Sequence, residues 1–157
     1  METVLAGAGA VAVAATALVF VQREAVHALL YLIVSLFALA VSMLALGAAF
    51  VAALEVIVYA GAIMVLFVFV VMMIGSRGPK VGFKAWIGPA LLSCALLGLL
   101  AYAAIRGSPD PYLKSAVAEI SPKAVGTALL GPYGLASEIA AFLLLSGLVS
   151  AYRIGHK

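Results

Sequence analysis

The chain has 157 residues, of which 67% are apolar and only 10% are charged, and its mean hydropathy is +1.28. Soluble domains are roughly 45–50% apolar and about 25% charged, so this composition excludes a water-soluble fold with a polar coat. The net charge of +3 therefore concerns orientation in a membrane and not binding to nucleic acid. We expect an all-α integral membrane protein.

Five apolar segments are long enough to cross a bilayer, which takes about 20 residues of helix. The predicted spans are residues 3–21, 26–46, 49–74, 85–105 and 132–152. The first follows Glu2, where a signal peptide would carry Lys or Arg, so we expect it to be retained. Together the spans predict a single transmembrane domain over residues 1–157, with its longest connection at 107–130.

The distribution of Lys and Arg predicts the orientation of these spans. With the N-terminus outside, the inner side takes six of the nine basic residues: Arg23, Arg77, Lys80, Lys84, Arg153 and Lys157. The outer side takes Arg106, Lys114 and Lys123. The positive-inside rule therefore favours an outer N-terminus and an inner C-terminus. The outer loop 107–130 contains three prolines, and we expect it to be ordered only against a partner.

The third span carries a carboxyl group, Glu55, at its seventh residue, about 10 Å from its outer end. A carboxylate in hydrocarbon is costly unless it is protonated, paired or facing water, so it marks either proton handling or a structural hydrogen bond to a neighbouring helix. Four residues later, Tyr59 shares the same helix face. Its hydroxyl group needs a partner at that depth.

Three small residues, Ala60, Gly61 and Ala62, follow at about the midpoint of this span, before the bulky run that begins with Ile63 and Met64. Such a site allows either close packing against another helix or an opening of the hydrogen-bond ladder into a π-bulge. From the residues alone, close packing is the favoured interpretation.

A second carboxyl group, Glu138, lies about six residues into the fifth span. In the predicted orientation the third and fifth spans run in the same direction, which places Glu55 and Glu138 at similar depth, where they could share a polar layer. The residues slightly favour the alternative, a carboxylate near the start of a helix that is stabilised by the positive end of its dipole.

The remaining residue types argue against redox chemistry in this chain. Cys94 is the single cysteine, which leaves no thiolate set for an iron-sulfur cluster. His27 and His156 sit at the ends of apolar runs and are poorly placed as a haem ligand pair. We expect His27 to be an interfacial residue at the inner start of the second span, and we expect no catalytic residue, metal site or cofactor site in the chain.

Three stretches together resemble one protein family over nearly the whole chain. The stretch from Leu54 to Met73, with its Glu-x3-Tyr-Ala-Gly-Ala core, closely resembles the third helix of the subunit J family of bacterial NADH:quinone oxidoreductase, respiratory complex I. That family is the counterpart of mitochondrial NADH dehydrogenase subunit 6. Residues 26–33, and residues 121–126 continued by 131–138, resemble the same family.

The resemblance implies a five-helix, non-redox subunit of the bacterial inner membrane, lodged among subunits A, H, K and N. It implies that FMN, the iron-sulfur clusters, NADH and quinone are bound in other subunits. It also implies a proton path through Glu55, Tyr59 and Glu138, and a π-bulge in the third helix that changes between α and π forms. The implied π-bulge reverses the preference for close packing at Gly61. It assigns the gate to six residues: Tyr59, Ala60, Gly61, Ala62, Ile63 and Met64.

Two interpretations of other classes stay open beside a coupling subunit of a proton pump. One is an ion channel or transporter formed by several copies of this chain. Two buried acids, no basic residue within a span and no repeated halves argue against a complete transporter. The other is a purely structural adaptor, in which Glu55 only bonds a neighbour, including one in a related hydrogenase-type complex.

Overall fold

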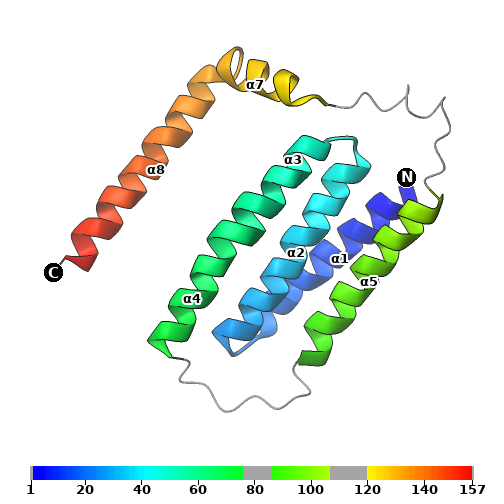
Figure 1. Cartoon of the computed structure of the whole chain (residues 1–157). Coiled ribbons are helices and arrows are strands. Elements are labelled where there is room, and N and C mark those ends of the chain that lie inside the picture. Colours follow the sequence, from blue (N-terminus) through cyan, green and yellow to red (C-terminus); the bar gives the residue numbers. More distant parts are fainter. Residues whose placement is uncertain (1, 76–85, 107–119, 157) are drawn as a thin grey trace. The chain divides into compact units, whose positions relative to one another are not determined.

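The computed structural model describes residues 2–75, 86–106 and 120–156, and every regular element in these ranges is a helix (Figure 1). Five helical stretches are long and apolar enough to cross a membrane: Glu2–Val21, Ala25–Ala45, Ala49–Ile74, Ile87–Ile105 and Gly134–Gly155. The expected all-α fold with five spans is confirmed. Which side of the membrane each terminus faces stays a prediction.

The backbone packs into two compact units, Met1–Glu119 and Ile120–Lys157, which are described separately here. The first holds four of the spans and the second holds the fifth. The expectation of a single transmembrane domain stays a prediction.

Helices α1 (Glu2–Val21) and α2 (Ala25–Ala45) form an antiparallel pair in the first unit (Figure 1). The buried face of α1 is a row of small side chains, because Ala8 and Ala15 are completely inaccessible and Ala12 is nearly so. Ala38 of α2 is equally inaccessible and belongs to the same apolar cluster. Small residues let two backbones approach closely, which is how helices associate where lipid removes the hydrophobic driving force.

A pair of hydroxyl groups joins these two helices. The oxygens Thr16 Oγ1 and Ser35 Oγ lie 2.7 Å apart. Thr16 Oγ1 is also 2.8 Å, and Ser35 Oγ 3.2 Å, from the carbonyl oxygen of Ala12. Ser35 is only 4% exposed, so its hydroxyl group obtains hydrogen bonds inside the helix pair and not from water.

Helix α2 is the centre of the first unit. It contacts α5 (Ile87–Arg106), and it contacts the third span along α3 (Ala49–Leu54), η1 (Glu55–Ile63) and α4 (Met64–Ile74). Gly47 makes the sharp turn into that span with a φ of +82°, a value that few residues besides glycine adopt at low cost. The third span is therefore held against α2 mainly from one side.

The second unit consists of α7 (Pro122–Leu130) and α8 (Gly134–Gly155). Ser121 caps α7 by accepting a hydrogen bond from the amide of Ala124 at 3.3 Å, and Pro122 occupies the first position, where no amide donor is needed. The described end of the expected loop 107–130 is therefore a helix with its own cap, and order that depends on a partner stays a prediction. Residues 107–119 of that loop lie outside the described residues.

Within each unit, much of the apolar surface is uncovered. Helix α4 has no buried residue, although it contacts α2, and α8 has none within the second unit. Spanning helices that expose Leu, Val and Phe are stable only in lipid or against other helices. This is the surface expected of one subunit of a larger membrane assembly.

Candidate functional site

The third span changes its hydrogen-bond pattern at Glu55. The amide of Glu55 still donates to carbonyl groups three and four residues back, those of Ala52 and Val51. At the other end of η1, the amide of Met64 donates to the carbonyl group of Tyr59, five residues back. Nine residues, Glu55–Ile63, thus form a π-helix inside an otherwise α-helical span. The expected π-bulge is confirmed, but it begins at Glu55 and ends one residue before Met64.

Gly61 lies close to a carbonyl group of its own wider turn. A Cβ atom built on Gly61 would be 3.1 Å from the carbonyl oxygen of Val56 and would meet no side chain within 4 Å. The close packing of Gly61 against another helix, which the residues alone favoured, is therefore not found within the described first unit. The glycine instead leaves room for a carbonyl group of its own π turn.

The residues of the expected gate divide between two faces. Ala60 is the one buried residue of η1, with 6% of its surface exposed, and η1 packs on α2. Tyr59 is 50% exposed, and Gly61, Ala62 and Ile63 are exposed as well. One side of η1 is therefore fixed within the chain, while the side that carries the Tyr59 hydroxyl group faces outward.

Glu55 is the only acidic side chain within the third span, and it is partly buried. Its carboxyl group has no hydrogen bond or ion pair with any described residue. A carboxyl group in a spanning helix needs a polar partner, because an unsatisfied polar group in hydrocarbon costs several kcal/mol. No described residue of the first unit supplies that partner, so Glu55 requires water, another subunit or a residue outside the first unit.

Glu138 is the fifth residue of α8 and is exposed. The favourable effect of a helix dipole falls off within the first turn, so the dipole is a weak explanation for a carboxyl group one turn further on. Glu138 belongs to the second unit, and a polar layer shared with Glu55 stays a prediction.

Two polar features of the first unit were not expected as buried groups. His27 is 5% exposed, whereas we expected an interfacial residue. The Thr16–Ser35 pair was not singled out. A usable signal is present on α2, where His27, Tyr31 and Ser35 follow at intervals of four residues and so share a face.

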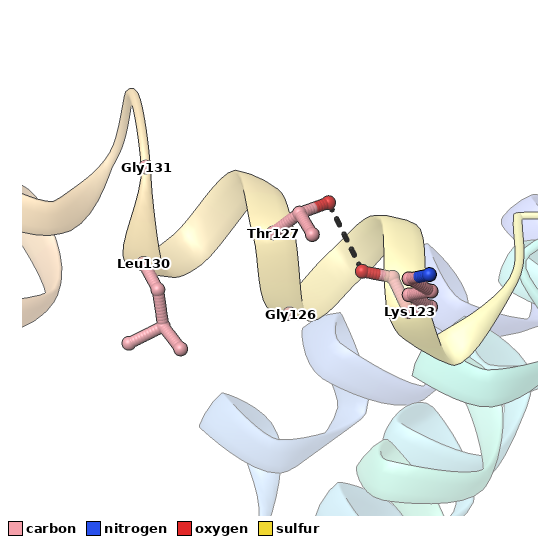
Figure 2. Close-up of a pocket in the computed structure, with 5 residues that line it drawn as sticks. All are labelled: Lys123, Gly126, Thr127, Leu130 and Gly131. Atoms are coloured by element: carbon pink, nitrogen blue, oxygen red, sulfur yellow. Dashed lines mark hydrogen bonds between the residues drawn. The ribbon is translucent and has the colours of Figure 1, made fainter.

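The second unit has a shallow surface depression beside α7 (Figure 2). It is lined by Lys123, Gly126, Thr127, Leu130 and Gly131. The Thr127 hydroxyl group donates to the carbonyl oxygen of Lys123 at 3.0 Å, which occupies it within the helix. One lysine and no second titratable group give this depression no acid–base chemistry. Among the described residues, no three His, Cys, Asp or Glu side chains are grouped as metal ligands would be.

Comparison with known proteins agrees with this architecture. A family model described as NADH-ubiquinone/plastoquinone oxidoreductase chain 6 matches residues 15–154. The protein called NADH-quinone oxidoreductase subunit J in Escherichia coli K12 is 49% identical over 156 residues, which cover 95% of this chain and 83% of that protein. Subunit J of Pseudomonas aeruginosa is 45% identical, over 100% of this chain and 98% of its own length. In Thermus thermophilus, NADH-quinone oxidoreductase subunit 10 is 36% identical, over 85% of this chain and 77% of its own.

Proposed function

Because the chain belongs to the family of NADH-ubiquinone/plastoquinone oxidoreductase chain 6, we propose that it couples quinone reduction to proton translocation through a carboxylate path and a gate in its third span. It is a subunit of the membrane arm of NADH-quinone oxidoreductase and a non-catalytic part of that enzyme complex. It is a multi-pass membrane protein whose partners are other subunits of the complex.

The proposal includes the finer assignments that the family resemblance implies. The neighbouring subunits are A, H, K and N, and the membrane is the inner membrane of a bacterium. NADH, FMN, the iron-sulfur clusters and quinone are bound elsewhere in the complex, so electron transfer takes place in other chains. The contribution of this chain is then to accept and pass protons and to change its shape.

One observation carries the gate: the π-helix Glu55–Ile63 separates a half of the span that has a buried residue from a half that has none. Before it, α3 is anchored on α2 by the buried Ala52. After it, α4 has no buried residue. A return of the π turns to α-helix would rotate one half relative to the other by roughly 100° for each residue removed from a turn. Rotation of α4 would change its contact with α2 but would displace no buried side chain of α4.

The rotation gives the path a physical switch. Glu55 is the first residue of η1, next to the anchored α3, and Tyr59 is its middle residue. Phe67 and Phe69 of α4 are 52% and 59% exposed, so rotation would sweep bulky apolar side chains around the axis while the carboxyl group of Glu55 stays in place. An aromatic side chain that enters a file of water molecules breaks it, and one that leaves restores it. Proton passage would thus follow the backbone state of η1.

Replacement of one carboxyl group tests the proton-handling part. Glu55→Gln keeps the shape and most hydrogen bonding of the side chain but cannot release a proton. We expect complex levels near those of the parent, with reduced proton translocation per NADH oxidised in membrane vesicles. Glu2→Gln, at the exposed start of α1, is the matched control and should change neither.

The competing functions give different results in the same material. Normal pumping by Glu55→Gln at normal complex levels would leave only the structural adaptor. Loss of assembly together with activity would likewise assign Glu55 to subunit contacts. In mild detergent, co-migration of the chain with an NADH-oxidising assembly supports the coupling subunit, whereas an active homo-oligomer would establish the channel.

A further inference from the structure

The imidazole ring of His27 is buried at the start of α2, away from η1, and only one of its nitrogens has a partner among the described residues. Nδ1 lies 2.9 Å from Oε2 of Glu24. Because an ionised carboxylate only accepts hydrogen bonds, the Nδ1 hydrogen is donated to it. A neutral ring then has Nε2 as an acceptor, and this buried atom has no hydrogen-bond partner in the described structure.

The bond to Glu24 also determines where Nε2 points. Glu24 lies three residues before His27, about one helical turn toward the start of α2. The two ring nitrogens point in different directions, so Nε2 points away from Glu24. Tyr31, four residues after His27, shares its helix face and is only 6% exposed.

The start of α5 lies against the same face of α2. The rings of His27 and Trp86, the residue just before α5, make an edge-to-face contact with centroids 5.9 Å apart. A Cβ atom built on Gly88 would collide with the Tyr31 hydroxyl group, so this hydroxyl group lies against the backbone of the first turn of α5. The first amides of a helix have no acceptor within it. An acceptor nitrogen, a hydroxyl group and the first amides of a helix therefore lie along the same contact between α2 and the start of α5.

We propose that His27, Tyr31 and the first turn of α5 bind one ordered water molecule. Its class follows from the chemistry of the groups around it. Water donates a hydrogen bond to Nε2 and accepts bonds from amide and hydroxyl donors at the same time, and buried waters typically make about three hydrogen bonds to groups that are otherwise unsatisfied. If the ring were protonated, the same water molecule would accept the hydrogen on Nε2, whereas a protein N–H group in that place could not. Nε2 is buried within this chain, so we assign its partner to water and not to a side chain of another subunit.

The site would link two spans that come from distant parts of the first unit. Glu24 fixes the ring, the ring holds the water, and the water ties α2 to the start of α5. His27 is thus a positioning residue, separate from the carboxylate path and the gate of the third span. The proposal depends on the fold of the first unit and is independent of the proposed coupling function.

A density map of the intact complex, in lipid or mild detergent, at a resolution that shows ordered water at other buried polar groups, tests the site. We expect a water peak within hydrogen-bond distance of both His27 Nε2 and the Tyr31 hydroxyl oxygen. Absence of that peak in such a map, or a protein donor bound to Nε2, overturns the proposal.

Two variants test whether these groups hold the water. His27→Asn keeps a donor near the position of Nδ1, and so the bond to Glu24, but has no atom in place of Nε2, and we expect the peak to be lost. Tyr31→Phe removes one partner and should weaken the peak, while Tyr152→Phe, in the second unit, is the matched control and should leave it unchanged. A peak that persists unaltered in His27→Asn shows that Nε2 does not bind the water and refutes the assignment.

Discussion

Gly61→Ala is the most direct perturbation of the π-helix in the third span. The new Cβ atom would meet the carbonyl oxygen of Val56 at 3.1 Å and nothing else within 4 Å. A regular α-helix accepts Ala at any interior position, and Ala is the residue that stabilises it most. The substitution therefore acts against the π form alone, without a clash against another described helix.

The size of the effect follows from this contact. Ordinary van der Waals contacts of a Cβ atom begin at 3.4 Å, so the 3.1 Å contact must lengthen by a few tenths of an ångström. A bond-angle change of about 7° moves a Cβ atom by roughly 0.2 Å and costs about 1 kcal/mol. We therefore expect the π form to lose about 1 kcal/mol relative to the α form, which is roughly a five-fold change in their ratio.

Classification of single-particle images of the intact complex measures that ratio, by sorting particles according to the backbone of residues 55–63. The same preparations are assayed for NADH-driven proton translocation in vesicles. Gly98→Ala in α5 is the control, because a Cβ atom built there meets nothing within 4 Å and belongs to a regular α-helix. An unchanged ratio and unchanged coupled turnover in Gly61→Ala, or the same loss in Gly98→Ala, would refute the reasoning.

Three further predictions concern the scaffold around this site. Gly131→Ala should destabilise the turn between α7 and α8, because its Cβ atom would lie 2.7 Å from the backbone oxygen of Thr127. Gly126→Ala meets nothing within 4 Å and should stabilise α7 by up to about 1 kcal/mol. The level of assembled complex should therefore be lower for Gly131→Ala than for Gly126→Ala, and the opposite order contradicts the prediction. Ser35→Ala removes the bond between helices and should weaken the α1–α2 pair by about 0.6 kcal/mol. Ser42→Ala removes only a bond within α2, so equal thermal shifts of the solubilised complex for the two variants would show that the bond between helices adds nothing. Cysteines placed at Ser76 and Ser108, with Cys94 replaced, should be labelled from the inner and outer side, respectively, and labelling of Ser108→Cys from the inner side only would reject the predicted orientation.

The spans were predictable because hydrocarbon leaves an apolar chain few choices. Backbone groups in lipid must bond within their own helix, so an apolar run of sufficient length is a helix whatever its propensities. The predicted span 49–74 has the bounds of the observed Ala49–Ile74. The predicted span 132–152 begins two residues before, and ends three residues before, the observed Gly134–Gly155. Its start was placed too early because Pro132 favoured a helix start there, whereas Pro132 belongs to the turn before α8.

The π-helix could not be derived from the residues, because α and π ladders use the same backbone groups and the same apolar side chains. Gly61 signals a need for space but does not reveal whether another helix or its own carbonyl group takes that space. The family resemblance predicted a π-bulge from Tyr59 onward, but it did not predict that the π-helix begins at Glu55. Helix α7 was not predicted because the three prolines and the low apolar content of residues 107–130 indicated a loop, although Ser121 followed by Pro122 is a helix-start signal.

The exposure of α8 ties the lifetime of this chain to that of its complex. Within the second unit, α8 has no buried residue and carries a carboxyl group in its second turn, so that unit by itself presents both apolar surface and a polar group. A polar group in hydrocarbon is costly, so such a helix is held weakly in lipid until it is covered. We therefore expect copies made in excess to be degraded, so that the amount of this subunit follows that of its partners without separate control of its synthesis.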